Sequence, residues 1–201
     1  MRDHANPWRL FSINDEAGTL MCTYPEGCDK PKIPITYCEE TMHGFEYAFA
    51  GLLISEGFID EGLSVVRAVR EKYRGHNRNP YNELECGSNY ARSMASFALL
   101  SIFSGFRFDL SEGYIGFDPL VSKDDYRCIW SLGPAWGQVR INEKETVVRI
   151  CDGNLMLKEL RLPYIKEITS LTIDGREIEF TKKDGSIYFA PTKIEKTILV
   201  K

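Results

Sequence analysis

The sequence predicts an α+β fold, with helices in the first half of the chain and an antiparallel β domain in the second. Two observations carry this prediction. Three long apolar segments before residue 105 are each closed by a glycine, which is typical of helix ends. From about residue 114, short runs of alternating residues are separated by Asp-Gly pairs, which supply the positive φ values that tight hairpins need. We therefore divide the chain into residues 1–110 and 111–201.

The composition is that of a globular protein. Of 201 residues, 43% are hydrophobic and 27% are charged, which excludes a disordered tail, a collagen-like chain and a coiled coil. The 25 basic and 29 acidic residues give a net charge of −4, so we expect no nucleic-acid partner. The N-terminus lacks the apolar core of a secretion signal, and no apolar run is long enough to span a membrane. We expect a cytoplasmic protein without a membrane span.

The first predicted element is an irregular segment, residues 1–36, in which four prolines prevent long helices. It is rich in large apolar residues, so we expect it to lie extended on something larger. The three predicted helices and their closing glycines are residues 38–56 with Gly57, 60–73 with Gly75, and 88–104 with Gly105. Thr36 and Glu39 have the spacing of a capping box at the start of the first helix.

The predicted helices differ in their faces. The first and third are apolar nearly all round, so they need covering on more than one side, which suggests a part of a larger helical assembly. The second is amphipathic, and we interpret its basic residues as a solvated face: Arg67, Arg70, Lys72, Arg74, His76 and Arg78. The predicted strands are residues 126–132, 138–141, 146–151, 155–162, 167–173, 177–180, 186–189 and 197–200.

Polar residues gather in two places. Residues 79–92, around the start of the third predicted helix, carry two carboxylates, amides, two tyrosines and an arginine, and carboxylates and amides there can bind the hydroxyls of a sugar. The alternative is helix capping with a local Glu–Arg pair. At the first predicted helix, His43 is either a general base or a histidine with ordinary structural contacts. Glu46 lies in an apolar stretch and needs a partner or a function.

The chain has no glycine-rich phosphate loop, no Ser-His-Asp set and no paired-cysteine zinc spacing, and we expect neither a cofactor nor a metal. The six cysteines, at positions 22, 28, 38, 86, 128 and 151, are expected to be reduced, with a disulfide set as the alternative.

Several motifs occur in the order found in one enzyme family. They are Asn6-Pro7-Trp8, Asp15-Glu16-Ala17-Gly18-Thr19, Glu40-Thr41-Met42-His43-Gly44-Phe45-Glu46-Tyr47, Asn79-Pro80-Tyr81-Asn82-Glu83-Leu84-Glu85-Cys86-Gly87 and Tyr90-Ala91-Arg92-Ser93-Met94-Ala95-Ser96. Over residues 5–120 the chain resembles glycoside hydrolase family 116, which includes non-lysosomal glucosylceramidases and bacterial β-glucosidases. The resemblance implies that the chain holds the C-terminal helices of an (α/α)6 barrel followed by an antiparallel β domain.

The resemblance also implies a role in a retaining β-glucosidase-like glycoside hydrolase. The family's nucleophile and acid/base carboxylates come from segments upstream of this match, so no catalytic residue is assigned and the chain alone is expected to be inactive. Glu83 and Arg92 match residues that hold the O4 and O6 hydroxyls of glucose in subsite −1, and Glu40 matches another carboxylate near that sugar.

Three further residues are expected to line the same sugar pocket: Met42, His43 and Asn82. Family members often have tryptophan where this chain has Met42. The expected partners are a β-glucoside or another sugar, and the missing upstream part of the enzyme. The alternative function is a non-catalytic carbohydrate- or protein-binding module derived from such an enzyme.

Overall fold

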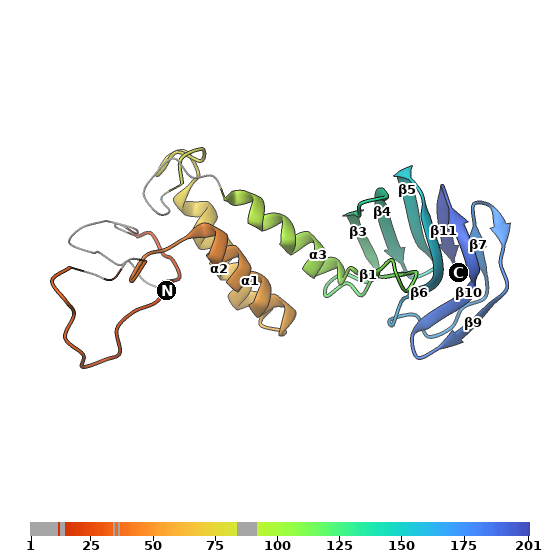
Figure 1. Ribbon diagram of the computed structural model, residues 1–201, viewed down its shortest axis with the longest axis horizontal. Helices are drawn as coiled ribbons and strands as arrows, with labels where there is room; N and C mark the ends of the chain where they lie inside the picture. Colours follow the sequence, from red (N-terminus) through yellow and green to blue (C-terminus); the bar gives the residue numbers. More distant parts are fainter. Residues whose placement is uncertain (1–11, 13–14, 34, 36, 84–91) are drawn as a thin grey trace. The chain divides into compact units, whose positions relative to one another are not determined.

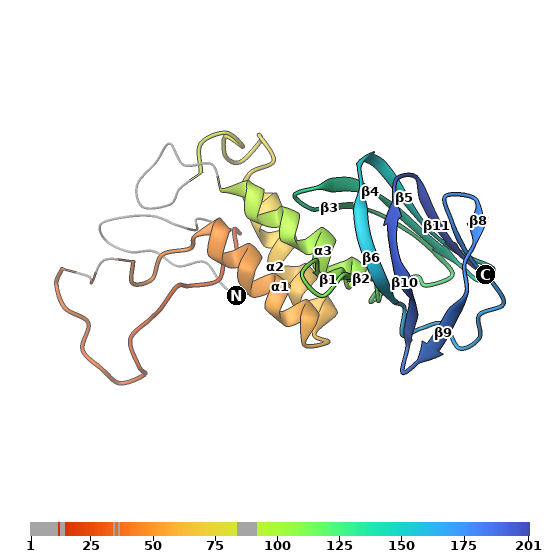
Figure 2. The same ribbon diagram turned by 45° about the vertical axis from the view of Figure 1, so that its right-hand side comes forward.

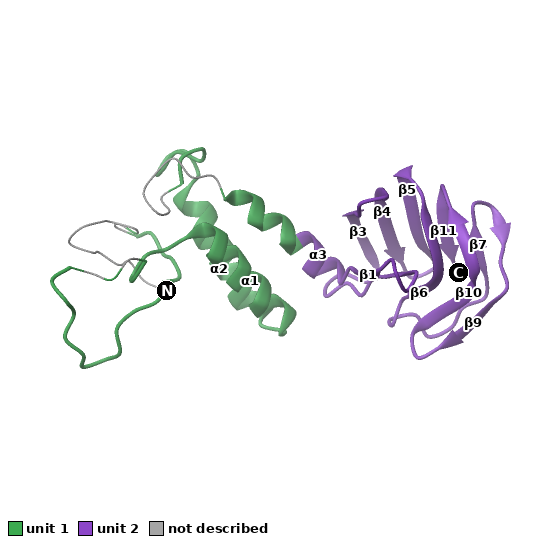
Figure 3. Ribbon diagram, viewed as in Figure 1, with its two compact units in different colours: residues 1–99 green, residues 100–201 purple. Residues whose placement is uncertain are grey.

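The computed structural model describes residue 12 and residues 15–33, 35, 37–83 and 92–201. The chain divides into two compact units, residues 1–99 and residues 100–201 (Figure 3). The sequence pattern had placed a boundary after residue 110. The two units are described separately below.

Unit 1 is built on a helical hairpin. Helices α1 (His43–Ser55) and α2 (Ile59–Lys72) lie side by side, and both views of the ribbon show the pair (Figures 1 and 2). The turn between them uses Gly57 at φ 90°, as the closing glycine predicted. A side chain at Gly62 of α2 would place its Cβ 2.5 Å from a carbon of Ile54, so this glycine lets the helices approach closely. The 3-10 helix η1 (Ser93–Phe97) packs on α1 and continues into α3 (Ala98–Ser104).

Helix α1 begins later than the predicted start at residue 38. Tyr37 and Glu39 have left-handed φ values of 69° and 61°, which a helix cannot include. The residues that follow pair instead with an earlier part of the chain, through an antiparallel bridge between Leu20 and Thr41. The predicted capping box therefore does not begin α1, and its Thr36 lies outside the described residues.

Unit 2 holds the strands. Their bounds are β1 (Arg107–Asp109), β2 (Tyr114–Gly116), β3 (Asp125–Ser131), β4 (Ala135–Asn142), β5 (Thr146–Gly153), β6 (Leu155–Arg161), β7 (Leu171–Ile173), β8 (Arg176–Glu177), β9 (Phe180–Lys183), β10 (Ser186–Ile194) and β11 (Thr197–Val200). One sheet has the order β1-β2-β6-β10-β9 and the other β3-β4-β5-β11-β7-β8. The pairing is antiparallel throughout, apart from the parallel pair β2–β6.

The core of unit 2 comes from strand alternation. Along β4, Val139 and Ile141 are 1% and 0% exposed, whereas the residue between them faces solvent. The inward side chains of both sheets form a single apolar cluster that includes Trp130. The Asp174-Gly175 and Asp184-Gly185 pairs join β7 to β8 and β9 to β10, with both residues of each pair at positive φ. These two predicted hairpin turns are confirmed.

The predicted fold class is wrong. The described residues form three short α-helices and eleven strands in two large, mostly antiparallel sheets, so the chain is mostly β and not an (α/α)6 barrel segment followed by a β domain. The first predicted helix is shortened by its pairing with an earlier segment. The third is described only from residue 93, as a 3-10 helix followed by a seven-residue α-helix. Unit 2 also contains strands β1 and β2, which the sequence pattern did not predict.

None of the helices in the described part of the chain has the length and apolar character that crossing a bilayer requires. The described cysteines are free thiols: Cys22, Cys28, Cys38, Cys128 and Cys151. Cys86 lies outside the described residues.

Candidate functional site

Unit 1 contains a set of buried polar side chains that we call the buried polar cluster. It lies where residues 15–22, the start of α1 and the end of α2 come together. Its members are 1–5% exposed and are Glu39, Glu40, Thr41, His43, Glu46, Lys72 and Glu83. Charged side chains are rarely buried this completely unless they are paired, so each of them requires a partner or a function.

Lys72 and Glu46 form the centre of the cluster. The Lys72 ammonium lies 3.6 Å from Oε2 of Glu46 and donates a hydrogen bond of 3.3 Å to the hydroxyl of Thr41. The other oxygen of Glu46 accepts a 2.7 Å hydrogen bond from the backbone N–H of Thr19. The Lys72 ammonium and the Thr19 backbone are thus the partners that the sequence required for Glu46, and these contacts join three parts of the chain.

Burial and pairing act in opposite directions on these two groups. Burial raises the pKa of Glu46, against the opposing effect of the Lys72 ammonium. Burial lowers the pKa of Lys72, against the opposing effects of Glu46 and Glu16. Because each partner favours the charged form of the other, removing one would leave the other buried without compensation.

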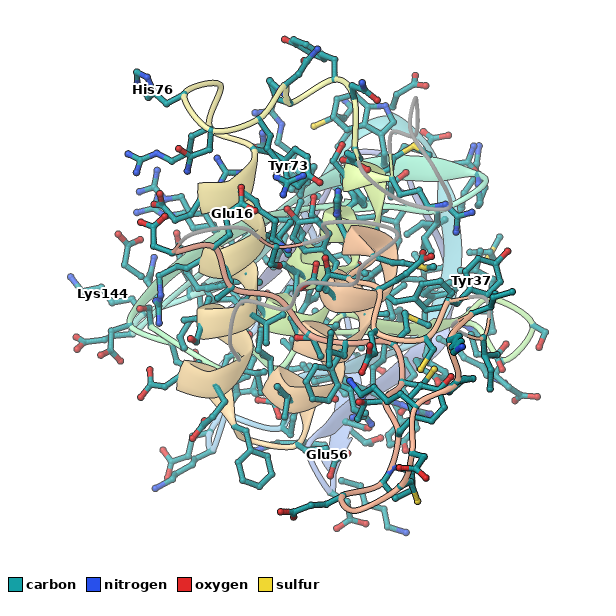
Figure 4. The ribbon with its side chains drawn as sticks, turned by 90° about the vertical axis from the view of Figure 1, so that its left-hand side faces the viewer. Glu16, Tyr37, Glu56, Tyr73, His76 and Lys144 are labelled. Atoms are coloured by element: carbon teal, nitrogen blue, oxygen red, sulfur yellow. The ribbon has the colours of Figure 1, made fainter. Side chains whose placement is uncertain are left out.

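A second ion pair lies near the end of α2. Arg78 donates two hydrogen bonds to Glu16, of 2.8 and 2.6 Å, and this bonding raises the pKa of the guanidinium. Figure 4 labels Glu16 and Tyr73, the residue that follows the last residue of α2. The predicted solvated face is therefore wrong at two positions, since the Lys72 side chain is 0% exposed and that of Arg78 is 17% exposed.

His43 is the first residue of α1 and is 1% exposed. Its ring lies 4.3 Å from that of Tyr73, between centroids, and its Nε2 lies 3.9 Å from Oε2 of Glu83. Within the described part of the chain, neither ring nitrogen makes a hydrogen bond. Burial, reinforced by the charges of Lys72 and Arg78, lowers the pKa of His43 to about 4, so the imidazole is neutral at pH 7.

The structure brings some of the predicted sugar-contact residues together. Glu83 is buried, and its carboxylate accepts a hydrogen bond from the backbone N–H of Arg92. His43 faces the same carboxylate. By contrast, Arg92 and Asn82 are both exposed, so among the described residues of the predicted loop the buried one is Glu83.

Glu40 and Met42 lie immediately before α1, at 5% and 2% exposure. Met42 is the N-cap residue, and its side chain is covered by other parts of the protein. The rest of the predicted loop, residues 84–91, lies outside the described residues.

Sequence reasoning missed Lys72. The buried stripe of α2 consists of Gly62, Val65, Val69 and Lys72, whose spacing of three and four residues is that of one helix face. The sequence did contain a signal for the burial of Lys72. Extending the apolar stripe of Val65 and Val69 by one helical turn leads to this lysine.

In the cluster, the neutral imidazole of His43 can donate one hydrogen bond and accept another, and the neighbouring buried carboxylate of Glu83 can only accept. A ligand hydroxyl that bridges the two can donate a hydrogen bond to Glu83 and accept one from the N–H of His43. In the described ranges, no group of three or more His, Cys, Asp or Glu side chains is placed to hold a metal ion.

No protein-family model matches the chain, and no curated protein sequence matches it.

Proposed function

We propose that this chain supplies sugar-binding contacts to a retaining β-glucosidase- or glucosylceramidase-like glycoside hydrolase, whose nucleophile and acid/base carboxylates lie in an upstream part of the enzyme. Glu83 and His43 bind hydroxyls of the glucose unit in subsite −1. We assign four further residues to the same sugar-binding region: Glu40, Arg92, Met42 and Asn82. The motif resemblance supplies the substrate class.

The observation that carries the proposal is the pair His43 and Glu83. Both ring nitrogens of His43 are buried without a hydrogen bond in the described part of the chain, and Nε2 lies 3.9 Å from a carboxylate oxygen of Glu83. Buried polar atoms in native proteins almost always have a partner, so such nitrogens point to a group that completes the site. A sugar carries several adjacent hydroxyls, each of which both donates and accepts, and this matches an imidazole next to a carboxylate.

The bonding of the carboxylates supports a binding role over a catalytic one. Glu46 is held by the Lys72 ammonium and the Thr19 backbone, and Glu83 accepts a hydrogen bond from Arg92. A retaining glycosidase needs two carboxyl groups about 5 Å apart that are available to the anomeric carbon and the leaving oxygen. Carboxylates already engaged in structural bonds are better suited to holding a sugar than to attacking it.

The exposed apolar side chains of α1 support an upstream partner. Phe45, Phe49 and Leu52 are 48%, 40% and 57% exposed and follow one another at spacings of four and three residues. Such a stripe on a helix surface is typical of a contact with further polypeptide.

The test is a calorimetric titration of the purified chain with methyl β-D-glucopyranoside. We expect binding by the wild type and an affinity about tenfold weaker in Glu83→Gln, because a hydrogen bond to a charged acceptor becomes one to a neutral acceptor. Glu56→Gln is the matched control, since Glu56 is an exposed residue after α1 (Figure 4), and it should leave the affinity unchanged.

A second ligand sharpens the assignment. Methyl β-D-xylopyranoside lacks the hydroxymethyl group, so it cannot use a contact to O6, and Glu83→Gln should weaken it less than the glucoside. Equal losses for both sugars, or no loss in Glu83→Gln, would contradict the assignment of Glu83. Turnover of 4-nitrophenyl β-D-glucopyranoside by the chain alone would contradict the absence of the catalytic pair.

The alternative function is a non-catalytic carbohydrate- or protein-binding module. The two functions are distinguished by mixing this chain with the upstream part of a family enzyme and measuring hydrolysis. Under the main proposal the mixture hydrolyses the aryl glucoside, and Glu83→Gln lowers the rate. Sugar binding that persists while the mixture stays inactive would favour the module.

A further inference from the structure

The six-stranded sheet of unit 2 has a hollow of about 710 Å³ on its surface, lined by residues of β3, β4, β5 and α3. The three strands lie next to one another in the sheet (Figure 1). A volume of this size lies within the range of about 300–1,000 Å³ that is usual for small-molecule sites. All the residues that line the hollow belong to unit 2.

Three arginines from adjacent strands converge on the hollow. Arg127 of β3 lies directly opposite Arg140 of β4, and Arg149 of β5 lies opposite Gln138 of β4. All four side chains are on the outer face, because the alternate residues of these strands are buried in the core. No acidic side chain is among the residues that line the hollow. Like charges directly opposite each other on a sheet repel, so this arrangement costs stability when nothing is bound.

The guanidinium groups are largely uncommitted. Arg127 lies 3.6 Å from the exposed carboxylate of Asp125. With respect to the described residues, Arg140 and Arg149 make neither an ion pair nor a side-chain hydrogen bond. Each guanidinium therefore keeps its planar fork of donors, whose geometry matches a carboxylate or a phosphate.

The rest of the lining is apolar and fixed in place. Ile129 of β3 and Leu100 of α3 are 46% and 41% exposed, and Val147 of β5 lies between Arg140 and the next strand. The last turn of α3 is held to the same unit by backbone hydrogen bonds of 3.0 Å, from Leu120 to Phe103 and from Asp118 to Ser104. The Cys128 thiol of β3 donates a hydrogen bond of 3.7 Å to the backbone oxygen of Leu100, so the wall that Leu100 forms is attached to the sheet.

We propose that this hollow binds a small organic anion, with a carboxylate or phosphate group attached to an apolar body. The arginines bind the acidic group, Gln138 adds a neutral hydrogen-bonding group, and the aliphatic side chains cover the apolar body. A neutral sugar lacks the charge that three converging cations require, and inorganic phosphate lacks the apolar part that the hollow would cover.

The test is a calorimetric titration of the full chain with three probes that share a naphthalene ring: 1-naphthyl phosphate, 1-naphthoate and 1-naphthol. We expect the two anions to bind and the uncharged naphthol to bind at least about tenfold more weakly, because it forms no charge-assisted hydrogen bond. The two anions separate phosphate from carboxylate as the natural acidic group. Inorganic phosphate should bind about tenfold more weakly than its naphthyl ester, since it buries no apolar surface.

Substitution tests the position of the site. The double variant Arg140→Gln/Arg149→Gln should weaken the anions by at least about tenfold and remove most of the dependence of binding on salt. Arg176→Gln, at an exposed arginine on β8 of the same sheet, should have no effect. Thermal unfolding of each variant checks that the sheet is intact.

Four results would overturn the proposal. They are equal binding of naphthol and the anions, unchanged binding in the double variant, an equal loss in Arg176→Gln, and no binding of either anion. If only vesicles containing phosphatidylserine bound in an arginine-dependent way, the face would be a membrane surface and the small-ligand site would be wrong.

Discussion

Acid should destabilise unit 1 through His43. Burial lowers the pKa of this histidine from its ordinary value of 6.5 to about 4, so between these values the unfolded chain binds a proton that the folded chain does not. By proton linkage, the contribution of His43 to stability is present in full above pH 6.5 and is lost as the pH falls toward the folded-state pKa. At about 1.36 kcal/mol per pKa unit, the loss between pH 7 and pH 5 is about 2 kcal/mol.

The assay is urea unfolding at pH 7 and pH 5, followed by circular dichroism at 222 nm, because α1 and α2 both belong to unit 1. The wild type is compared with His43→Phe, which keeps a ring beside Tyr73 and cannot titrate. Only the change in stability with pH is compared between the two proteins, so a constant difference in packing does not matter. Glu46 acts in the opposite direction, since its raised pKa favours the folded state in acid, and it is present in both proteins.

The matched control is His76→Phe. His76 is an exposed histidine in the loop after α2 (Figure 4), so its removal should leave the pH dependence as in the wild type. The reasoning is refuted if His43→Phe loses as much stability as the wild type between pH 7 and pH 5. It is also refuted if His76→Phe and His43→Phe reduce the pH dependence equally, because burial would then not be the cause.

Two further predictions concern buried charge and turn chemistry. Lys72→Met should cost about 3 kcal/mol in urea unfolding, because it leaves the Glu46 carboxylate buried without its amine, whereas Arg74→Met removes an exposed ion pair and should cost less than about 0.5 kcal/mol; similar losses would contradict the pairing. Asp174→Asn should cost about 1.5 kcal/mol, because three backbone N–H groups donate to this carboxylate and, against the effect of burial, lower its pKa. Asp184→Asn, at the same position of the other hairpin, should cost less than about 0.5 kcal/mol. The free energy of unfolding of each variant is measured by tryptophan fluorescence, and equal losses in the two variants would contradict this prediction.

The strand half of the fold was largely readable because its signals are local. Each of the eight predicted runs overlaps an observed strand, and the run at residues 197–200 matches β11 at both ends. Alternation and Asp-Gly turns act within a few residues, so they survive in a single sequence. Strands β1 and β2 were missed because they are three residues long and β2 pairs in parallel with the distant β6, which no local pattern encodes.

The helix half was predicted less well because a distant segment competes for its residues. Residues 39–41 have helical neighbours in sequence, yet they pair with residues 20–22 through backbone hydrogen bonds such as that from Met21 to Glu40. The candidate site shows the same division. Glu83 and His43 were both noticed as residue types, but their 3.9 Å approach joins positions forty residues apart. Lys72 was assigned to solvent, although it stands in register with buried valines.

By itself, the sequence determined several of the places where elements stop and turn. The closing glycines Gly57, Gly75 and Gly105 all adopt positive φ, and so do both residues of the Asp174-Gly175 turn. These outcomes depend on steric limits of a single residue, which its neighbours cannot change. Only the tertiary structure decided that the chain is mostly β, which charges are buried and which face each other. Burial and pairing depend on the free energy of contacts between distant segments, and a residue's own type does not contain that information.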